Sequence, residues 1–318
     1  MISDIPATST ALPWQADVWS HLLQQIEKQQ LPHALLLTGV QHSGKARLAL
    51  ALARLLLCHQ PESGNNCGKC HACELSRSGS HGDFRWLEPE GSSRVIKIDQ
   101  VRDLVEFAGK TASLGRHKLV VLSPAESLNT AAANALLKSL EEPSSGTYII
   151  LVCHRLQGLP ATIRSRCQTL KLTMPDPQIS LSWLDRQTGN SADSEKALHL
   201  AHGQVLLAEK LIQEGALDAA AAIRSALDAL GSGQGSVQGL GVLMANEPVE
   251  DLLSQLHEHL EQLVHKMDAL ALSSKTGRAT FGLLDEVVRL QRVVYSGANP
   301  NRQLLVDSLS ARFEMVLT

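Results

Sequence analysis

Short apolar runs alternate with longer amphipathic segments over the first ~175 of the 318 residues. Runs of this length, bounded by turn residues, predict buried strands, and the segments between them have the three-to-four-residue spacing of helices. Strands that alternate with helices indicate a parallel sheet covered on both faces. The predicted strands are HALLLTG (33–39), KLVVLS (118–123), TYIILVC (147–153) and QTLKL (168–172).

Helical spacing is clear both inside this region and after it. Leu48, Leu52, Leu55 and Leu56 fall on one face after Lys45, and a second helix is predicted before Pro143, which ends it. The last third of the chain is predicted to be helical throughout. Its clearest segments are VEDLLSQLHEHLEQLVHKM (249–267), LLDEVVRLQRVV (283–294) and NRQLLVDSLSARF (301–313). The glycine-rich segment 231–241 is predicted to be a loop between helices or a domain linker.

Two prolines in MPDPQ (174–178) exclude a continuous helix or central strand and predict a domain boundary. We therefore expect three domains. The first is an α/β domain over 1–175, the second a small helical domain over 176–212, and the third an all-helical domain over 213–318.

Composition supports a helix-rich protein, with 44% hydrophobic, 19% charged and 3% aromatic residues. The net charge of −3 gives the whole molecule no cationic field for nucleic acid, so any DNA contact is expected to be local or shared with partners. The N-terminal sequence lacks the pattern of a signal peptide, and no apolar run reaches the length of a membrane span. These features predict a cytoplasmic protein with no membrane association.

Four of the six cysteines lie within 16 residues, at Cys58, Cys67, Cys70 and Cys73. In a cytoplasmic protein this clustering favours metal binding over disulfides. Four thiolates would close a tetrahedral Zn²⁺ shell, so the predicted zinc is structural and has no open position for catalysis. Unmetallated thiols and an iron–sulfur cluster are the alternatives. The outlying Cys153 and Cys167 are expected to be buried thiols.

The segment GVQHSGK (39–45) has the spacing of a phosphate-binding loop. Gly39 and Gly44 permit a nest of backbone N–H groups, and Lys45 can reach a β-phosphate. Ala46, however, stands where a working loop has the Ser or Thr hydroxyl that holds magnesium. An empty loop kept for its geometry and a loop that binds nucleotide both remain open.

The second half of a nucleotide site is also altered. A working site has Asp and Glu at the end of a second apolar strand, where they hold magnesium and orient water. In KLVVLSPAES (118–127) these two positions are Ser123 and Pro124, and Glu126 comes two positions late to replace the missing base. We therefore expect no magnesium-dependent hydrolysis.

Several motifs resemble one family, the AAA+ clamp-loader subunits of bacterial DNA polymerase III. These are LPHALLLTG (31–39), the altered loop with Ala46, the four-cysteine module, NALLKSLEEP (134–143) and LPATIRSRCQ (159–168). The resemblance is strong over the first ~175 residues and weaker beyond, where NPNRQLLVDSL (299–309) is similar to the closing helix of the family's collar. It implies an AAA+ domain with a zinc module at 58–73, a helical lid and an all-α collar.

The resemblance also assigns a role to Arg166. The arginine of the family's Ser-Arg-Cys motif is a finger that reaches the γ-phosphate held by a neighbouring subunit. Keeping it without a working home site makes chemical sense only if it acts in trans. A structural arginine capping its own helix is the alternative, and Arg164 is the weaker candidate for the finger.

Other nucleotide sensors of the family are missing. Cys153 and His154 replace a polar Thr pair, and Leu206 aligns with the lid arginine. These losses are similar to those of the delta-prime branch and unlike the gamma/tau motor subunits. They imply a non-hydrolysing subunit that assembles with gamma/tau and delta in a pentameric ring, which loads the sliding clamp onto primed DNA.

Two other functions are weighed against this one. The first is an ATP-hydrolysing motor subunit, which Ala46, Ser123, Pro124 and Leu206 oppose. The second is a zinc-dependent nucleic-acid-binding module, which the net charge and the few aromatic residues oppose. The segment SRSGSHGDFRW (76–86), with Arg77, His81 and Arg85, is expected to be a solvated loop.

Overall fold

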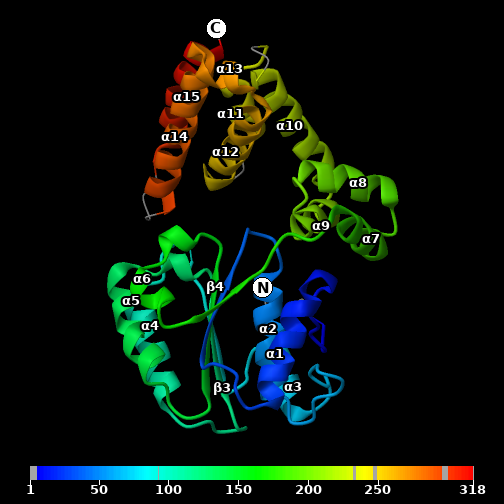
Figure 1. Cartoon of the computed structure of the whole chain (residues 1–318), viewed down its shortest axis with the longest axis vertical. Coiled ribbons are helices and arrows are strands. Elements are labelled where there is room, and N and C mark those ends of the chain that lie inside the picture. Colours follow the sequence, from blue (N-terminus) through cyan, green and yellow to red (C-terminus); the bar gives the residue numbers. More distant parts are fainter. Residues whose placement is uncertain (1–5, 92, 232–233, 246–248, 296–299, 318) are drawn as a thin grey trace. The chain divides into compact units, whose positions relative to one another are not determined.

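The computed structural model describes residues 6–91, 93–231, 234–245, 249–295 and 300–317. The chain divides into two compact units, Met1–Glu209 and Lys210–Thr318. Figure 1 shows a sheet with flanking helices in the first unit and helices alone in the second. The α/β class predicted for the first part and the helical class predicted for the last part are confirmed.

Five parallel strands form the sheet of the first unit, in the order β2-β3-β4-β1-β5. Strands β1, β3 and β4 are almost wholly buried, because helices cover both faces, and this explains their continuous apolar sequences. Four of the five strands are those predicted. The strands are β1 (Ala34–Thr38), β2 (Phe84–Leu87), β3 (Lys118–Leu122), β4 (Thr147–Cys153) and β5 (Gln168–Lys171).

Strand β2 corrects the prediction of a solvated loop over 76–86. Phe84–Leu87 pairs with β3, and His81 and Asp83 just before it are buried, although 77–80 are exposed. The Asp83 carboxylate accepts hydrogen bonds from the backbone N–H groups of Ser113 and Leu114, each at 2.7 Å, and lies 3.9 Å from the Lys118 ammonium. These partners lie about 30 residues away in the sequence, so the local polarity of the segment gave a wrong prediction.

Two hydrophobic clusters cover the two faces of the sheet. Figure 1 shows α1 and α2 on one face, and α4, α5 and α6 on the other. The predicted helices after Lys45 and before Pro143 are confirmed as α2 and α5. The helices of this part are α1 (Ala16–Glu27), α2 (Lys45–Leu57), α3 (His71–Arg77), α4 (Ile98–Gly109), α5 (Thr130–Glu141) and α6 (Ala161–Arg164), with short 3₁₀ turns at Pro13–Gln15, Ala125–Ser127 and Leu156–Gly158.

A small group of helices follows the sheet. It begins after the predicted break, with Pro177 as the first residue of α7 and the Asp176 carboxylate accepting a hydrogen bond from the Gln178 N–H at 2.8 Å. The division between the two compact units falls inside the last of these helices. The domain limits at 175/176 and 212/213 therefore stay predictions. The helices are α7 (Pro177–Thr188), α8 (Ser191–Leu200) and α9 (Val205–Gln213).

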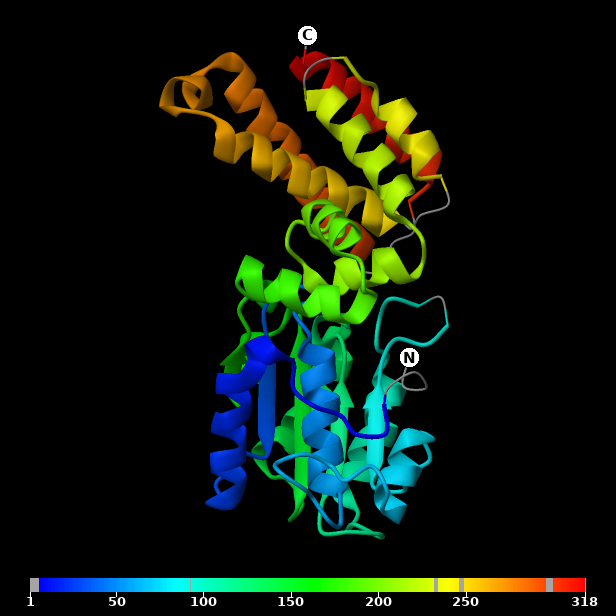
Figure 2. The same cartoon turned by 90° about the vertical axis from the view of Figure 1, so that its right-hand side faces the viewer.

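The second unit has its own core, built from leucine and valine side chains of five helices. Helices α12 and α14 pack as a pair (Figure 2), and this pair contacts the group of α10, α11 and α15 through α14 with α15 and α12 with α10. Nowhere in the described ranges does a helix have both the length and the apolarity that crossing a membrane requires. The helices are α10 (Leu217–Gly231), α11 (Val237–Leu243), α12 (Val249–Lys266), α13 (Ala269–Ser273), α14 (Lys275–Tyr295) and α15 (Arg302–Leu317).

Helix α11 corrects the prediction that 231–241 is a loop or linker. The Ser236 hydroxyl accepts a hydrogen bond from the Gly239 N–H at 3.0 Å and caps the helix. A Cβ atom on Gly241 would lie 2.8 Å from Cγ1 of Val306 on α15. Gly241 therefore has a packing role, because it lets α11 and α15 approach closely.

We predict that Gly241→Val lowers the free energy of unfolding of the second unit by about 1–3 kcal/mol, since a side chain there must displace Val306. Gly282→Val on α14 is the matched control, because within the described part of the chain nothing lies within 4 Å of its Cβ position. Both substitutions replace glycine by valine inside a helix, so their difference in urea unfolding isolates the contact. Equal midpoints would contradict this role for Gly241.

Candidate functional site

The predicted phosphate loop joins β1 to α2 at the carboxyl edge of the sheet, where parallel α/β proteins bind ligands. Gly39 and Gly44 both have positive φ angles, of 143° and 89°. Neither position has room for a side chain. A Cβ atom on Gly39 would lie 2.3 Å from the Leu172 carbonyl oxygen, and one on Gly44 would lie 2.5 Å from Cδ1 of Leu12.

Lys45 turns back over this loop and is almost fully buried. Its ammonium donates to the Gly39 carbonyl at 2.8 Å, to the Val40 carbonyl, and to the Ser43 hydroxyl at 3.3 Å. Burial lowers the pKa of Lys45 to about 8, although Glu126 and Cys153 act in the opposite direction. The loop thus supplies three acceptors for the three N–H groups of the lysine, and a phosphate would compete with them.

The ends of β3 and β4 lie at the same edge, but they carry no paired carboxylates. Glu126 is the acidic residue there, and its side chain is only 3% exposed. Its carboxylate accepts hydrogen bonds from the backbone N–H groups of His154, at 3.1 Å, and Arg155, at 3.2 Å. Glu126 therefore holds the backbone that follows β4. Burial, then Glu126, raises the pKa of the Cys153 thiol to about 12.

The segment before α1 holds the phosphate loop by hydrogen bonds. The Trp14 indole and the Gln15 amide both donate to the Ser43 carbonyl, at 3.1 and 3.2 Å. The Gln15 side chain also accepts from the Leu12 N–H at 3.0 Å. These bonds fix the backbone of the loop without any ligand.

The small helices α7 and α9 contact the same region through one basic side chain. Arg47 pairs with Glu209 of α9 at 2.5 Å, and its guanidinium lies 5.9 Å from the ring centre of Trp183 on α7. Trp183 in turn meets Trp14 edge to face, with ring centres 5.4 Å apart. Glu209 lies three residues after Leu206 on α9 and gives α2 an acidic partner.

The four clustered cysteines come together as predicted. Their sulfur atoms all lie within 4.8 Å of one another, and three of the separations are 3.6–3.9 Å. Four sulfurs around one Zn²⁺ at about 2.3 Å would be about 3.8 Å apart, so the geometry is compatible with a zinc module. The four residues Cys58, Cys67, Cys70 and Cys73 could therefore bind a metal ion.

Hydrogen-bond donors surround these sulfurs. The Cys67 N–H donates to the Cys58 sulfur at 3.3 Å, and the Asn66 amide donates to the Cys73 sulfur at 3.4 Å. Burial acts to raise the pKa of Cys70, but hydrogen bonds, first from the backbone N–H groups of Cys73 and His59, lower it to about 6, whereas burial raises the pKa of Cys58 to about 12 and also raises that of Cys73. Donors aimed at the sulfurs stabilise thiolates, which are the form that binds metal.

A buried arginine connects the metal module to the rest of the unit. Arg54 of α2 donates to the Pro6 carbonyl and the Ser9 hydroxyl, each at 2.8 Å, and to the Ser76 carbonyl at 3.4 Å. The Ser9 N–H in turn donates to the Asn66 side chain at 2.8 Å. The module, the N-terminal segment and the helix of the phosphate loop are thus held together by one guanidinium.

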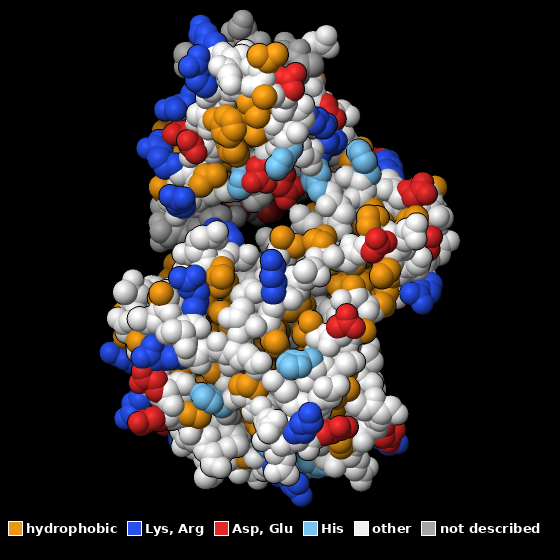
Figure 3. All heavy atoms as spheres, in the orientation of Figure 1, with side chains coloured by type: hydrophobic (Ala, Val, Ile, Leu, Met, Phe, Trp, Pro, Cys, Tyr) orange, Lys and Arg blue, Asp and Glu red, His pale blue; other side chains and the backbone are white. Residues whose placement is uncertain are grey.

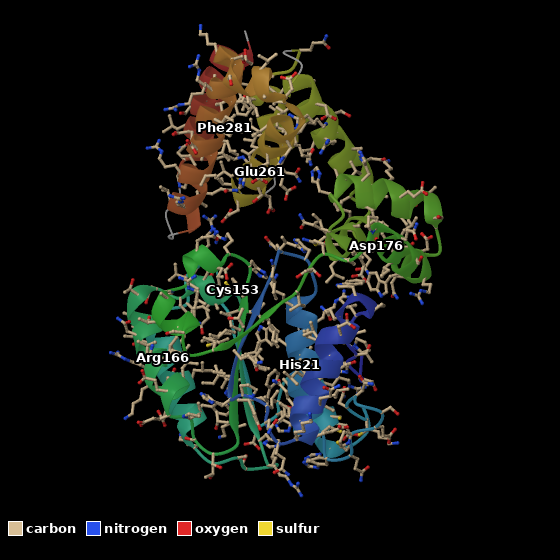
Figure 4. All side chains as sticks on the ribbon, viewed as in Figure 1. His21, Cys153, Arg166, Asp176, Glu261 and Phe281 are labelled. Carbon is tan, nitrogen blue, oxygen red and sulfur yellow. The ribbon has the colours of Figure 1, made fainter. Side chains whose placement is uncertain are left out.

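Arg166 lies far from this loop. Figure 4 shows it beside α5, clearly apart from Cys153 at the end of β4. Its guanidinium pairs with Glu141 of α5 and donates to the Thr162 carbonyl at 2.8 Å, while 32% of the side chain is exposed. Arg164 is exposed. The structure does not bring Arg166 together with Gly39, Gly44 and Lys45.

Comparison with known proteins identifies the family of this chain. A family model described as DNA polymerase III, delta subunit, matches residues 14–176. The delta-prime subunit of DNA polymerase III from Pseudomonas aeruginosa is 36% identical over 315 residues, which cover 93% of this chain and 95% of that protein. The chain belongs to the delta-prime family of DNA polymerase III subunits. The resemblance drawn from the motifs is thereby confirmed, and the motor-subunit alternative is not favoured.

One further relative agrees with the family, and one solved structure agrees with the fold. The delta-prime subunit from Yersinia pestis is 34% identical over 299 residues, covering 91% of this chain and 84% of that protein. Among solved structures, a DNA polymerase III gamma subunit-related protein from Thermotoga maritima superposes with a TM-score of 0.55 and 19% identity, covering 94% of this chain and 99% of that one. This second likeness shows the fold alone.

Sequence analysis missed several residues that shape this delta-prime site. Arg54 left a visible signal, because a charged residue within the apolar run LALALARLLL (48–57) needs a buried partner. Arg47 and Glu209 left none, since each is an ordinary surface-type residue until α9 meets α2. The sequence also gives no sign that Trp14 and Trp183 contact each other.

His154 should make the stability of this delta-prime chain sensitive to acid. Burial, with Lys45, His42 and Arg155 nearby, lowers its pKa to about 3. Its Nδ1 atom is buried and has no hydrogen-bond partner among the residues described. The unfolded chain, with a histidine pKa near the ordinary value of 6.5, therefore binds the proton first as pH falls.

We predict that stability falls as pH drops from about 6.5 towards 3, with a slope of up to about 1.4 kcal/mol per pH unit from this residue. His154→Gln should make urea unfolding midpoints less dependent on pH between 7 and 5. His21→Gln, at an exposed position shown in Figure 4, is the control and should keep the wild-type slope. Identical slopes for both variants would refute the prediction.

Proposed function

We propose that this chain is a non-hydrolysing clamp-loader subunit that lends Arg166, in trans, to an ATP site on a neighbouring subunit. The observation that carries the proposal is the contrast between the phosphate loop of this chain and its arginine Arg166. The phosphate loop lacks the groups for turnover, whereas an exposed arginine of the Ser-Arg-Cys motif is kept on another surface.

The home site supports the first half of the proposal. Ala46 removes the magnesium-binding hydroxyl, and Ser123 and Pro124 remove both carboxylates. Glu126 cannot substitute for them in its present contacts, because its buried carboxylate accepts the N–H groups of His154 and Arg155. Lys45 lies over the loop, but position 46 supplies no hydroxyl and the end of β3 supplies no carboxylate pair that would bind magnesium beside it.

The surroundings of Arg166 support the second half. A guanidinium has five N–H groups in a planar fork, is always charged and fits phosphate oxygens in pairs. Arg166 is partly exposed and separate from its own loop, so a phosphate that it meets must be brought by another molecule. A finger of this kind stabilises the charge that develops on the transferred phosphoryl group.

We propose that the partners are gamma/tau and delta subunits in a pentameric ring, with the sliding clamp and primed DNA reached through the assembly, in the cytoplasm. The second unit supports this, because large apolar side chains are exposed on it, including Val242 at 76%, Leu270 at 84% and Leu304 at 69%. Figure 3 shows hydrophobic side chains on the face that carries Phe281, which Figure 4 labels in the same view.

We also propose that the four cysteines hold one structural Zn²⁺. The sulfur spacing and the surrounding N–H donors support this, and a metal there would stabilise a polar loop without taking part in chemistry. Because Arg54 ties the loop to α2 and to the N-terminal segment, the metal would act on the whole first unit.

The decisive experiment is a clamp loader reconstituted from gamma/tau, delta and this chain, with ATP turnover measured on primed DNA. With Arg166→Ala, the neighbouring site should lose on the order of 10³-fold in kcat, so turnover of the assembly falls at least by that site's share. Arg164→Ala, an exposed arginine two residues earlier, is the matched control and should behave like wild type.

Assembly is checked by gel filtration for each variant. Unchanged turnover with Arg166→Ala in an intact complex would reduce the role of this chain to scaffolding. Magnesium-dependent ATP hydrolysis by the isolated wild-type chain would instead support the motor function and contradict the proposal.

For the metal, we expect about one zinc per purified chain. Cys70→Ser should abolish most of this zinc and lower the thermal midpoint of the first unit sharply, because a structural zinc site contributes on the order of 10 kcal/mol. Cys167→Ser, outside the cluster, should retain the metal. A Cys70→Ser protein with full zinc content, or a wild-type protein with iron in its place, would show the assignment to be wrong.

A further inference from the structure

One ion pair at the surface of the first unit has no explanation in the stability of the fold. Arg166 donates through Nε and Nη2 to Oε1 of Glu141, the last residue of α5. The two side chains are 32% and 48% exposed, and pairs this exposed contribute little to stability. Their contact needs another reason.

The position of Glu141 is itself unfavourable in isolation. Glu141 and Glu142 stand together at the C-terminal end of α5, where the helix dipole disfavours negative charge. Lys138 is the basic residue in that last turn. The guanidinium of Arg166, which comes from a different segment 25 residues later, compensates the carboxylate of Glu141.

The contacts use only one edge of the guanidinium fork. Nε and Nη2 form the side that faces Glu141, and Nη1 donates to the Thr162 carbonyl at 2.8 Å, with the Ser165 hydroxyl at 3.4 Å. Of the five N–H groups, three have strong acceptors within the chain. The second N–H of Nη2 is left, and the second N–H of Nη1 has only the long contact with the Ser165 hydroxyl, so these two N–H groups can match two oxygens of a phosphate.

We infer that Glu141 is a positioning residue for Arg166, which holds the guanidinium by its side edge and presents its free end to a phosphate of the neighbouring subunit. This inference rests on the proposed function in trans. Because α5 and α6 pack together on the sheet, the pair of contacts from Glu141 and Thr162 sets the plane of the guanidinium before any partner arrives. Orientation of a charged group before reaction avoids a cost at the transition state.

The test uses the same reconstituted clamp loader, with kcat and KM for ATP measured on primed DNA. Glu141→Ala should lower kcat by roughly tenfold with little change in KM, since the arginine remains but loses its orientation. Glu141→Gln keeps one oxygen acceptor and should lose less. Glu142→Gln is the control, because within the described chain no hydrogen bond or ion pair joins Glu142 to Arg166.

A double variant, Arg166→Ala with Glu141→Ala, separates the roles of the two residues. If Glu141 acts through Arg166, the double variant should be no slower than Arg166→Ala alone. Equal kcat for Glu141→Ala and wild type, or a faster Glu141→Ala complex, would overturn the inference while Arg166→Ala still lowers turnover. Wild-type turnover with Arg166→Ala would instead remove the proposed function. Gel filtration confirms that each complex is assembled.

Discussion

The first unit depends on one requirement, which is that helix α2 must be covered from every side. Ten of its thirteen residues are buried, among them Lys45 and Arg54. A helix that is apolar around its whole circumference cannot face water, so the sheet, α1, the N-terminal segment and the metal module must all pack on it. The two charged residues are tolerated because carbonyl and hydroxyl oxygens surround them.

Contacts within the chain hold both the phosphate loop and the small helices in this packing. The loop at the start of α2 is held by Trp14 and Gln15, and α9 is held by the pair of Arg47 with Glu209. In a subunit whose lid closes on ATP, such contacts would have to form and break. Here both sets of contacts are made within one chain.

Much of this arrangement is visible in the sequence, for definite physical reasons. Parallel strands buried on both faces are continuous apolar runs, and four thiols at close spacing have few uses besides a metal. What escaped prediction depends on distant partners: β2 needs Ser113 and Lys118 to bury Asp83, and α11 tolerates Gly241 because Val306 lies against it. The contact of Glu141 with Arg166 likewise joins segments whose sequences give no hint of each other.

The engagement of Glu126 bears on how such a chain can evolve. A threonine at position 46 would restore a hydroxyl, but the Glu126 carboxylate already accepts hydrogen bonds from the backbone after β4. Freeing it would leave the backbone N–H groups of His154 and Arg155 without this acceptor, and the backbone after β4 would be held less firmly. A complete magnesium site would therefore need changes at positions 46, 123 and 124 together with new acceptors for the backbone after β4.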